Sequence, residues 1–475
     1  MRLMTTTFIA VGLMLMLGSG CTLAPEYRQP TLPVAEQLPA GQDNQSAPAM
    51  AGATAIVHAD LGWREFFTEP RLQELITLAL AHNRDLRQSA LTVEAYQAQY
   101  RIQRSALLPT VSAEGSGSKQ RTLSGGGHAT SEVYAASVGI TAYELDLYGR
   151  VQNLKDQALE QYLAQEETHR SARISLVAEV ARAYLTWLAD RELLTVTEDT
   201  LRIEEESFHL IDQRAREGIA TQLDLAQART SLETARANLA LYQRQVAQDG
   251  NSLTLLAGTT LPESLVKNAA LLSAQTIVAQ PPAHLPSRVL LQRPDIRAAE
   301  HDLKGAHADI GAARAAFFPT ISLTASAGAI NGDLAKLFDG QSGSWLFSPA
   351  INLPIFTAGR LQAQLDAAEI RKEISVARYE KAIQSAFQEA ADALVASETY
   401  VRQLAAQKAN LAANQEYHGL ARDRYQHGLD SFLTLLDAQR SLYSARQRYL
   451  ILQLAQLINQ VNLYKALGGG WQERS

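Results

Sequence analysis

The amino-acid sequence contains the same short motif twice. Residues 102–113 are IQRSALLPTVSA and residues 312–323 are AARAAFFPTISL, which places Pro109 and Pro319 at equivalent positions 210 residues apart. Further pairs keep this separation along the chain: Asp85 with Asp295, Glu179 with Glu389, Gly218 with Gly428 and Gly258 with Gly468. One constant offset over so much of the chain predicts an internal duplication in which both copies fold alike.

The duplication divides the chain into a small number of segments. In chain order we expect a signal peptide at 1–20, an extended strap at 21–64, a first repeat at 65–260, a linker at 261–285, a second repeat at 286–470 and a C-terminal tail at 471–475. The linker contains Pro262, Pro281 and Pro282, which helices disfavour. Each repeat is expected to contain a short helix, a β-hairpin, a long helix and a shorter returning helix.

A β-hairpin is expected after each repeated proline, because Pro ends a helix and restricts the residue before it. From Ile321 onward apolar residues alternate with Ser and Thr, which is the period of a strand with two different faces. Gly- and Ser-rich loops at 119–131 and 329–344 precede second strands, giving hairpins at 109–147 and 319–356. Strands of about ten residues cross a bilayer when they are tilted.

Four strands are too few to cross a membrane alone. A transmembrane barrel needs about eight strands, and an open sheet edge in lipid leaves backbone groups without hydrogen bonds. After residue 20 no apolar run reaches the length of a membrane-spanning helix. A chain of this kind that crosses a membrane must therefore assemble with copies of itself, and two copies supply eight strands whereas three supply twelve.

Long helices are expected after the hairpins. Runs rich in Ala, Gln, Glu and Arg begin near residues 150 and 360 and continue to Gly218 and Gly428, and Gly419 is the one earlier Gly or Pro in either run. Each run would extend about 100 Å at ~1.5 Å per residue. The two glycines are expected to end their helices in the left-handed conformation.

A returning helix is expected after each of these glycines, at 221–257 and 431–467. In the first of them, apolar residues recur at alternating steps of three and four, the spacing of a coiled-coil face. These residues are Leu232, Ala235, Leu239, Tyr242 and Val246.

The start of the chain resembles a bacterial lipoprotein signal. Residues 1–20 combine a basic start, an apolar stretch and a small-residue cleavage site, and Cys21 follows directly. We therefore expect acylation of Cys21, with Thr22 favouring delivery to the outer membrane and its lipid. The alternative is an ordinary secretory signal with an incidental cysteine. Because Cys21 is the one cysteine, the chain has no internal disulfide.

Other functional classes receive little support from composition and motifs. A net charge of −6 gives no indication of nucleic-acid binding. The 10 His residues include no paired metal-ligand spacing, so neither a metal nor a cofactor is expected. The Gly-rich stretch GSGSK at 115–119 lacks the spacing of a phosphate-binding loop and lies in an expected strand. An enzyme is therefore not expected.

Six further motifs carry a family resemblance. They are ELDLYGR at 144–150, LLQRPDI at 290–296, IGAARAAFFPTISL at 310–323, GSWLFSPAINLPIFTAGR at 343–360, FLTLLDAQRSL at 432–442 and LYKALGGGW at 463–471. Together they resemble the outer-membrane factors of the TolC and OprM type, most closely the OprM-like drug-efflux lipoproteins. The resemblance implies a mixed α and β membrane protein whose homotrimer forms a twelve-stranded β-barrel, four strands per chain, continued by a periplasmic α-helical coiled-coil tunnel. It also implies docking to a periplasmic adaptor protein and to an inner-membrane proton-driven pump of the RND class.

The resemblance places a gate near the second glycine turn. It implies an acidic ring at Asp437 and an apolar constriction at Leu433 one turn away. Carboxylates gathered about one axis would repel one another and favour cations. Arg440 lies three residues after Asp437, within reach of a helix-surface pair. The alternative is a solvated Asp–Arg pair on an outer face.

The first turn offers Asp224, which the resemblance links to Tyr425 of the second turn. Asp224 also follows Thr221 by three residues, the spacing of a helix capping box, so either role is open. Asp430 and Ser431 are expected to be N-caps. Thr434 stands where some family members have a second Asp, so one complete acidic ring is expected rather than two.

The expected function is a passive outer-membrane exit duct for drugs and other small molecules. An outer-membrane channel of a type I protein secretion system is the nearest alternative. A coiled-coil scaffold tethered to the membrane would explain the long helices, but it leaves the four alternating strands without a role.

Overall fold

The structure, a computed structural model, describes residues 22–39, 62–124, 127–263, 271–275 and 285–469. The chain forms two compact units, each assembled from distant segments. Unit 1 combines residues 1–31, 92–166 and 298–380, and unit 2 combines residues 32–91, 167–297 and 381–475. Both repeats contribute to both units. The expected signal peptide, Cys21, most of the strap and the tail at 471–475 lie outside the described residues.

The element boundaries confirm the duplication. The first repeat contains α4 (Arg84–Ser105), β1 (Val111–Ser124), β2 (Gly127–Leu145), α5 (Arg150–Arg216) and α6 (Gln222–Ala257). The second contains α8 (Pro294–Ala315), β3 (Thr320–Asn331), β4 (Gly343–Asn352), α9 (Arg360–Gln426) and α10 (Phe432–Ala466). Helices α4, α5 and α6 each begin 210 residues before α8, α9 and α10. Short elements complete the fold: α2 (Trp63–Phe66), α3 (Pro70–His82), η3 (Leu272–Ala274), η4 (Ser287–Gln292) and η5 (Leu334–Lys336).

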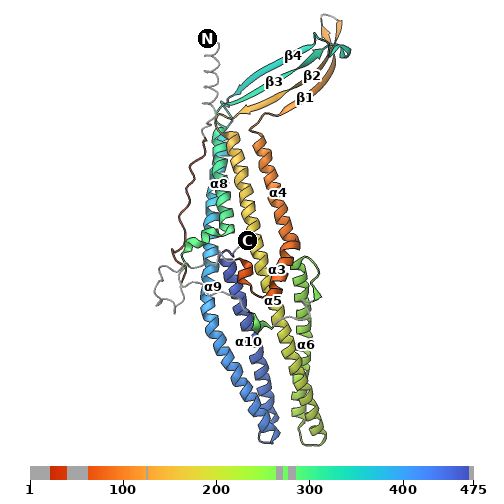
Figure 1. Cartoon of the computed structure of the whole chain (residues 1–475), viewed down its shortest axis with the longest axis vertical. Coiled ribbons are helices and arrows are strands. Elements are labelled where there is room, and N and C mark those ends of the chain that lie inside the picture. Colours follow the sequence, from red (N-terminus) through yellow and green to blue (C-terminus); the bar gives the residue numbers. More distant parts are fainter. Residues whose placement is uncertain (1–21, 40–61, 125–126, 264–270, 276–284, 470–475) are drawn as a thin grey trace. The chain divides into compact units, whose positions relative to one another are not determined.

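Unit 1 contains one antiparallel sheet in the order β1-β2-β3-β4 (Figure 1). Strands β1 and β2 pair without interruption from Val111↔Ile140 to Ser124↔Gly127. The loop expected at 119–131 is therefore mostly strand. The Gly- and Ser-rich composition suggested a loop, but cross-strand pairs, including an ion pair between Lys119 and Glu132, continue the ladder. The second loop holds η5, as its Gly- and Ser-rich sequence suggested.

A β-bulge in β2 changes the face of the sheet on which the following side chains lie. The pairing of β2 with β3 shifts between Ile140 and Tyr143, where Ala142 has a φ of 50° and its N–H donates to Oγ1 of Thr324 at 3.1 Å. An extra residue moves the following side chains to the other face of a strand. Tyr143 thus lies on the same face as Ile140, although it follows three positions later, where a regular strand would place it on the opposite face.

The observed register gives the sheet two chemically different faces, because directly paired residues point to one side. One face is mostly apolar and includes Val111, Ala113, Val138, Ile140, Leu323, Ala325, Phe347 and Ile351. The other is rich in hydroxyls and includes Ser112, Ser116, Ser137, Ser322, Thr324, Ser326 and Ser348. None of the described helices has both the length and the hydropathy needed to span a bilayer.

The strap is fixed to three helices of unit 1. The Thr22 hydroxyl donates to Oδ1 of Asn153 on α5 at 3.0 Å, and the Tyr27 hydroxyl donates to Glu300 on α8 at 3.1 Å. The side-chain amide of Gln29 donates to the Tyr379 hydroxyl on α9 at 2.9 Å. An extended segment with no core of its own is held by these side-chain contacts.

The main apolar core lies in unit 2. Trp63, Phe66 and Phe67 of α2 and its C-cap pack with residues of α3, the middle of α5 and the end of α10. The ring centroids of Phe66 and Tyr464 are 4.7 Å apart. Burying one such large side chain contributes about 2–3 kcal/mol relative to leaving it exposed.

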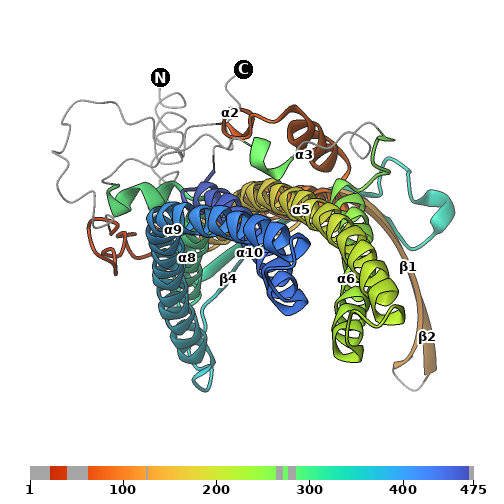
Figure 2. The same cartoon turned by 90° about the horizontal axis from the view of Figure 1, so that it is seen from below.

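Helix α6 lies beside α5, and α10 beside α9, in unit 2 (Figures 1 and 2). The expected apolar stripe of α6 is confirmed, because Leu232, Ala235 and Tyr242 are buried. One contact between α5 and α6 is acidic. The carboxyl groups of Asp190 and Asp249 interact, and Oδ2 of Asp249 is buried without a hydrogen-bond partner. Burial and the neighbouring Asp190 raise the pKa of Asp249 to about 6.

The acidic pair predicts a pH-dependent stability. Because the pKa of Asp249 is higher in the folded protein than in the unfolded chain, folding stability falls as pH rises through about 6. We expect Asp249→Asn to raise the midpoint of thermal unfolding by about 3 °C at pH 8 and by clearly less at pH 4.5, because most of the loss of stability occurs between these two pH values. Asp392→Asn, on the exposed surface of α9, is the control. An equal effect at both pH values would show that ionisation is not involved.

Candidate functional site

The two helical hairpins of unit 2 end in turns of the same construction. Gly218 and Gly428 follow the long helices with φ values of 74° and 72°. The N–H groups of Ile219 and Leu429 donate to the carbonyls of Arg214 and Arg424 at 2.8 and 2.9 Å. The glycines are thus left-handed C-caps, as expected. An added Cβ would meet no atom within 4 Å at either glycine, so backbone conformation rather than space requires them.

The two turns pack against each other through an apolar cluster. Ile211 of α5, Ala228 of α6, and Phe432 and Leu436 of α10 are buried together. Tyr425 at the end of α9 packs against this cluster, with its ring centroid 5.9 Å from that of Phe432. Contacts between these residues therefore join the first hairpin to the second.

A polar contact between the hairpins involves Tyr425, but its partner is not Asp224. Nη1 of Arg214 donates to the Tyr425 hydroxyl at 2.8 Å, and the guanidinium carbon lies 5.3 Å from the ring centroid. The Asp224 carboxylate instead accepts from the N–H and hydroxyl of Thr221 at 3.0 and 2.7 Å. The capping-box role is thus confirmed, and the expected Asp224–Tyr425 link is wrong in the single chain because the cap uses the carboxylate.

The N-cap expected at Asp430 is also wrong. Ser431 caps α10, because its hydroxyl accepts from the N–H of Thr434. Asp430 forms a two-pronged pair with Arg424, with distances of 2.7 and 3.0 Å. This hydrogen bond lowers the pKa of Asp430 below its usual value. A guanidinium six residues earlier, at the end of α9, holds this carboxylate through two charge-assisted hydrogen bonds.

The residues expected at the gate share one face of α10. Leu433, Asp437 and Arg440 are all exposed in the single chain, whereas Phe432 and Leu436 are buried. The expected pair between Asp437 and Arg440 does not form.

Asp437 and Arg440 each bind an opposing helix. The Tyr417 hydroxyl on α9 donates to Oδ2 of Asp437 at 3.2 Å. Nη2 of Arg440 donates to the Ser231 hydroxyl on α6 at 2.9 Å. The α10 face therefore carries one contact within the second hairpin and one to the first. No cluster of His, Cys, Asp and Glu among the described residues is arranged to hold a metal ion.

Sequence reasoning missed Arg214, Tyr417 and Arg424. The duplication contained a usable signal for two of them, because Arg214 and Arg424 are 210 residues apart and each precedes its glycine by four residues. No sequence pattern indicates Tyr417, because its contact with Asp437 depends on how α9 and α10 pack together.

Comparisons with known proteins agree with this architecture. A family model described as outer membrane efflux protein matches residues 75–259 and 285–469, two segments offset by 210 residues. The probable efflux pump outer membrane protein TtgC of Pseudomonas putida is 52% identical over 477 residues, which cover 99% of this chain and 97% of the relative. The cation efflux system protein CusC of Escherichia coli is 43% identical over 458 residues, which cover 96% and 97%.

A solved structure extends the likeness to the fold. The open state of the Neisseria gonorrhoeae MtrE outer membrane channel matches with a TM-score of 0.86 and 41% sequence identity, covering 95% of this chain and 99% of that chain. A duplicated chain with a two-faced sheet and paired helical hairpins is thus a channel protein of the outer membrane. It belongs to the outer membrane efflux protein family and is an efflux channel.

The Arg214–Tyr425 contact predicts coupling between the two turns. Tyr425→Phe removes the acceptor hydroxyl, and a hydrogen bond of about 1 kcal/mol corresponds to roughly fivefold faster amide exchange in the affected segment. We expect this increase in residues 209–220 of the first hairpin, measured by hydrogen–deuterium exchange. Tyr417→Phe is a matched control, because that hydroxyl bonds within the second hairpin. Equal protection in the parent and Tyr425→Phe would contradict the coupling.

Proposed function

We propose that three copies of this chain form a passive exit duct across the outer membrane, the last part of a tripartite pump. A periplasmic adaptor and an inner-membrane RND transporter would deliver small molecules to it. The observation that carries this proposal is the sheet of unit 1, which has an apolar face, a hydroxyl-rich face and two free edges. Three sheets joined edge to edge give twelve strands, with the apolar face toward lipid and the polar face toward a water-filled lumen.

The edge strands show why one copy is incomplete. Strands β1 and β4 each have one neighbour in the sheet. On and just beyond β4, Ile351, Ile355 and Phe356 are 71%, 91% and 88% exposed, and Val111 at the start of β1 is 64% exposed. Unpaired backbone groups in lipid cost several kcal/mol each, so the edges need partners.

The duplication predicts how two copies would pair. Within the chain, β2 of the first repeat pairs with β3 of the second, with Ile140 opposite Ala325. The equivalent contact joins β4 of one copy to β1 of the next. Gly115 corresponds to Ala325 at the usual offset. Ile351 corresponds to Ile140, because β2 has one extra residue at its bulge and β4 has no bulge. Ile351 should therefore lie opposite Gly115, and Leu353 opposite Ala113.

The strap supports the lipid anchor proposed at Cys21. Thr22, the next residue, donates to Oδ1 of Asn153, whose Nδ2 donates to the carbonyl of Gly149 at 2.7 Å. Gly149 lies four residues after β2 ends. Gly311 of α8 leaves room for this contact, since an added Cβ would lie 2.7 Å from the Asn153 side chain. The strap thus begins at the helix end of the sheet, where acyl chains could enter the membrane.

The exposed α10 face supports a gate. Leu433, Asp437 and Arg440 follow one another along this face and are exposed in the single chain, although Asp437 and Arg440 each bond one side chain of another helix. In a threefold assembly they would face the axis as rings. A ring of Asp437 carboxylates would favour cations and narrow the passage. Opening would require a partner that binds the open arrangement more tightly than the closed one.

The names of the relatives favour small-molecule export over protein secretion. They include an antibiotic efflux pump protein and a toluene efflux pump protein of Pseudomonas putida, as well as the cation efflux protein CusC. We infer that the cargo of this duct is chemically varied and that the pump selects it. The pump and adaptor themselves are proposals from family membership.

The predicted strand register can be tested by disulfide cross-linking. Ile351→Cys combined with Gly115→Cys should give cross-linked species up to a trimer on non-reducing gels of outer membranes. Gly115 accepts a side chain, because an added Cβ there meets no atom within 4 Å. Ile351→Cys with Lys119→Cys is the mis-registered control, since the latter lies about 13 Å further along β1. Cross-linking of the control alone, or of neither pair, would reject the register.

The gate can be tested in planar bilayers. Asp437→Ala removes the ring charge, so we expect higher single-channel conductance and a weaker preference for cations. Asp392→Ala, on the exposed surface of α9, should leave both unchanged. Unaltered conductance and selectivity in Asp437→Ala would remove this residue from the pore.

A further inference from the structure

The duplication also reveals a contact at the far ends of the returning helices. Asn83, which precedes α4, donates through Nδ2 to the carbonyl of Leu256 near the end of α6 at 3.0 Å. Arg293, which precedes α8, donates through Nη1 to the carbonyl of Ala466 at the end of α10 at 2.8 Å. Both donors and both acceptors are 210 residues apart. Each repeat thus ties its returning helix to the junction before its short helix.

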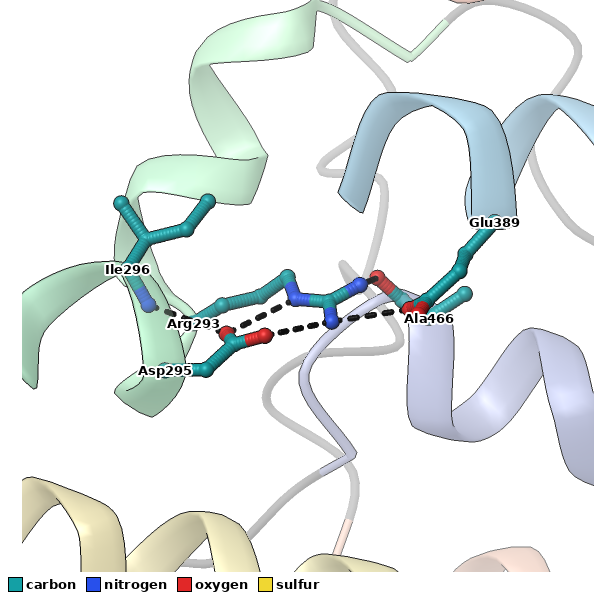
Figure 3. A network of polar contacts seen from close by, with 5 residues as sticks. All are labelled: Arg293, Asp295, Ile296, Glu389 and Ala466. Carbon is teal, nitrogen blue, oxygen red and sulfur yellow. Dashed lines mark hydrogen bonds and ion pairs between the residues drawn. The ribbon is translucent and has the colours of Figure 1, made fainter. Parts of the chain in front are cut away.

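In the second repeat, Arg293 has a longer side chain than its equivalent Asn83 and makes additional contacts (Figure 3). Arg293 is 5% exposed and forms a two-pronged pair with Asp295 at 3.0 and 2.7 Å. Its Nη2 also donates to Oε2 of Glu389 on α9 at 2.9 Å. One guanidinium therefore joins the end of α10 to the middle of α9. A planar group with five N–H donors suits three acceptors at once.

The first repeat has no equivalent of this connection to the long helix. Glu179 of α5 corresponds to Glu389, but it forms no hydrogen bond or ion pair within the described part of the chain. Asn83 has no charge and a shorter side chain. The carboxylate is therefore present in both repeats, but the cation that binds it is present in one.

A second difference between the repeats lies in the contact between each long helix and its returning helix. Asn459 of α10 donates to the carbonyl of Ala393 and to the Ser397 hydroxyl on α9, both at 3.0 Å. The residue equivalent to Asn459 in α6 is Asp249, which meets Asp190 of α5 instead. At these repeat-equivalent positions α9 and α10 are thus joined by two polar ties, whereas α5 and α6 meet at an acidic pair. Nearer the turns each hairpin has a further contact, Tyr417 with Asp437 in the second and Arg236 with Glu205 in the first.

We propose that Arg293, through Glu389, is a positioning residue that keeps α9 and α10 in register, so that the second hairpin moves as one body and holds Leu433 and Asp437 in place. The inference rests on the proposed gate. From Glu389 to the end of α9 is about 55 Å at ~1.5 Å per residue. The contacts of Arg293 with Glu389 on α9 and with Ala466 on α10 are here called the brace. A small sliding of α9 along α10 at the brace would be carried to the turn, because both helices are continuous to it.

The brace is tested with a pair of variants at repeat-equivalent positions. Glu389→Gln removes the charge that Arg293 binds, and Glu179→Gln makes the same change on α5, where the described residues supply no partner. Both residues are exposed, so neither change should prevent folding. In planar bilayers we expect about threefold higher open probability for Glu389→Gln and no change for Glu179→Gln. Arg293→Lys, which keeps the charge but cannot reach all three acceptors, should resemble Glu389→Gln.

Hydrogen–deuterium exchange gives a reading that does not depend on conductance. Glu389→Gln should increase exchange in α9 and α10 between the brace and the turn, while the midpoint of thermal unfolding changes by less than about 3 °C. Equal behaviour of Glu389→Gln and Glu179→Gln in both measurements would overturn the brace. A parent protein that forms no channel would overturn the proposed function, whereas the exchange comparison would still decide the brace.

Discussion

The unpaired edge strands of the four-stranded sheet are the constraint that requires this chain to assemble with other copies. Four strands provide both a lipid-compatible face and a water-compatible face, but β1 and β4 each leave one side without a backbone partner. In water such edges are only an aggregation hazard, whereas in lipid they carry a large energetic cost. Assembly is therefore a condition for stable insertion. The exposed apolar side chains next to those edges follow from the same requirement.

Much of the architecture could be predicted from the amino-acid sequence, because each element assigned in one repeat could be compared with the equivalent segment of the other. A Pro hinge, an alternating strand or a Gly turn that occurs at one offset in both repeats supports the same assignment from two independent segments. The boundaries of α5 and α9 were therefore predictable to within a residue or two. The loop at 119–131 was misassigned because its Gly and Ser residues suit turns, and only pairing with the opposite strand shows that they continue the ladder.

Side-chain partners at the turns were harder to predict than the turns themselves. Asp224 and Asp430 each had a plausible local role, and one took it while the other did not. Arg424, six residues before Asp430, holds that carboxylate. Its repeat equivalent Arg214 is also present, but position 220, the equivalent of Asp430, is Ala, and Arg214 donates to Tyr425 instead. Competition among nearby donors is decided by geometry that spacing alone does not specify. The Arg214–Tyr425 contact likewise requires the two hairpins to be packed together.

The strap has a consequence for the order of biosynthesis. Its hydrogen-bond partners belong to α5, α8 and α9, and Tyr379 is 350 residues away from Gln29. The segment that leaves the ribosome and the secretion machinery first can therefore be seated only after most of the chain has arrived and folded. Contacts of such long sequence separation form late. An early membrane tether at its end would keep this waiting segment close to its destination throughout maturation.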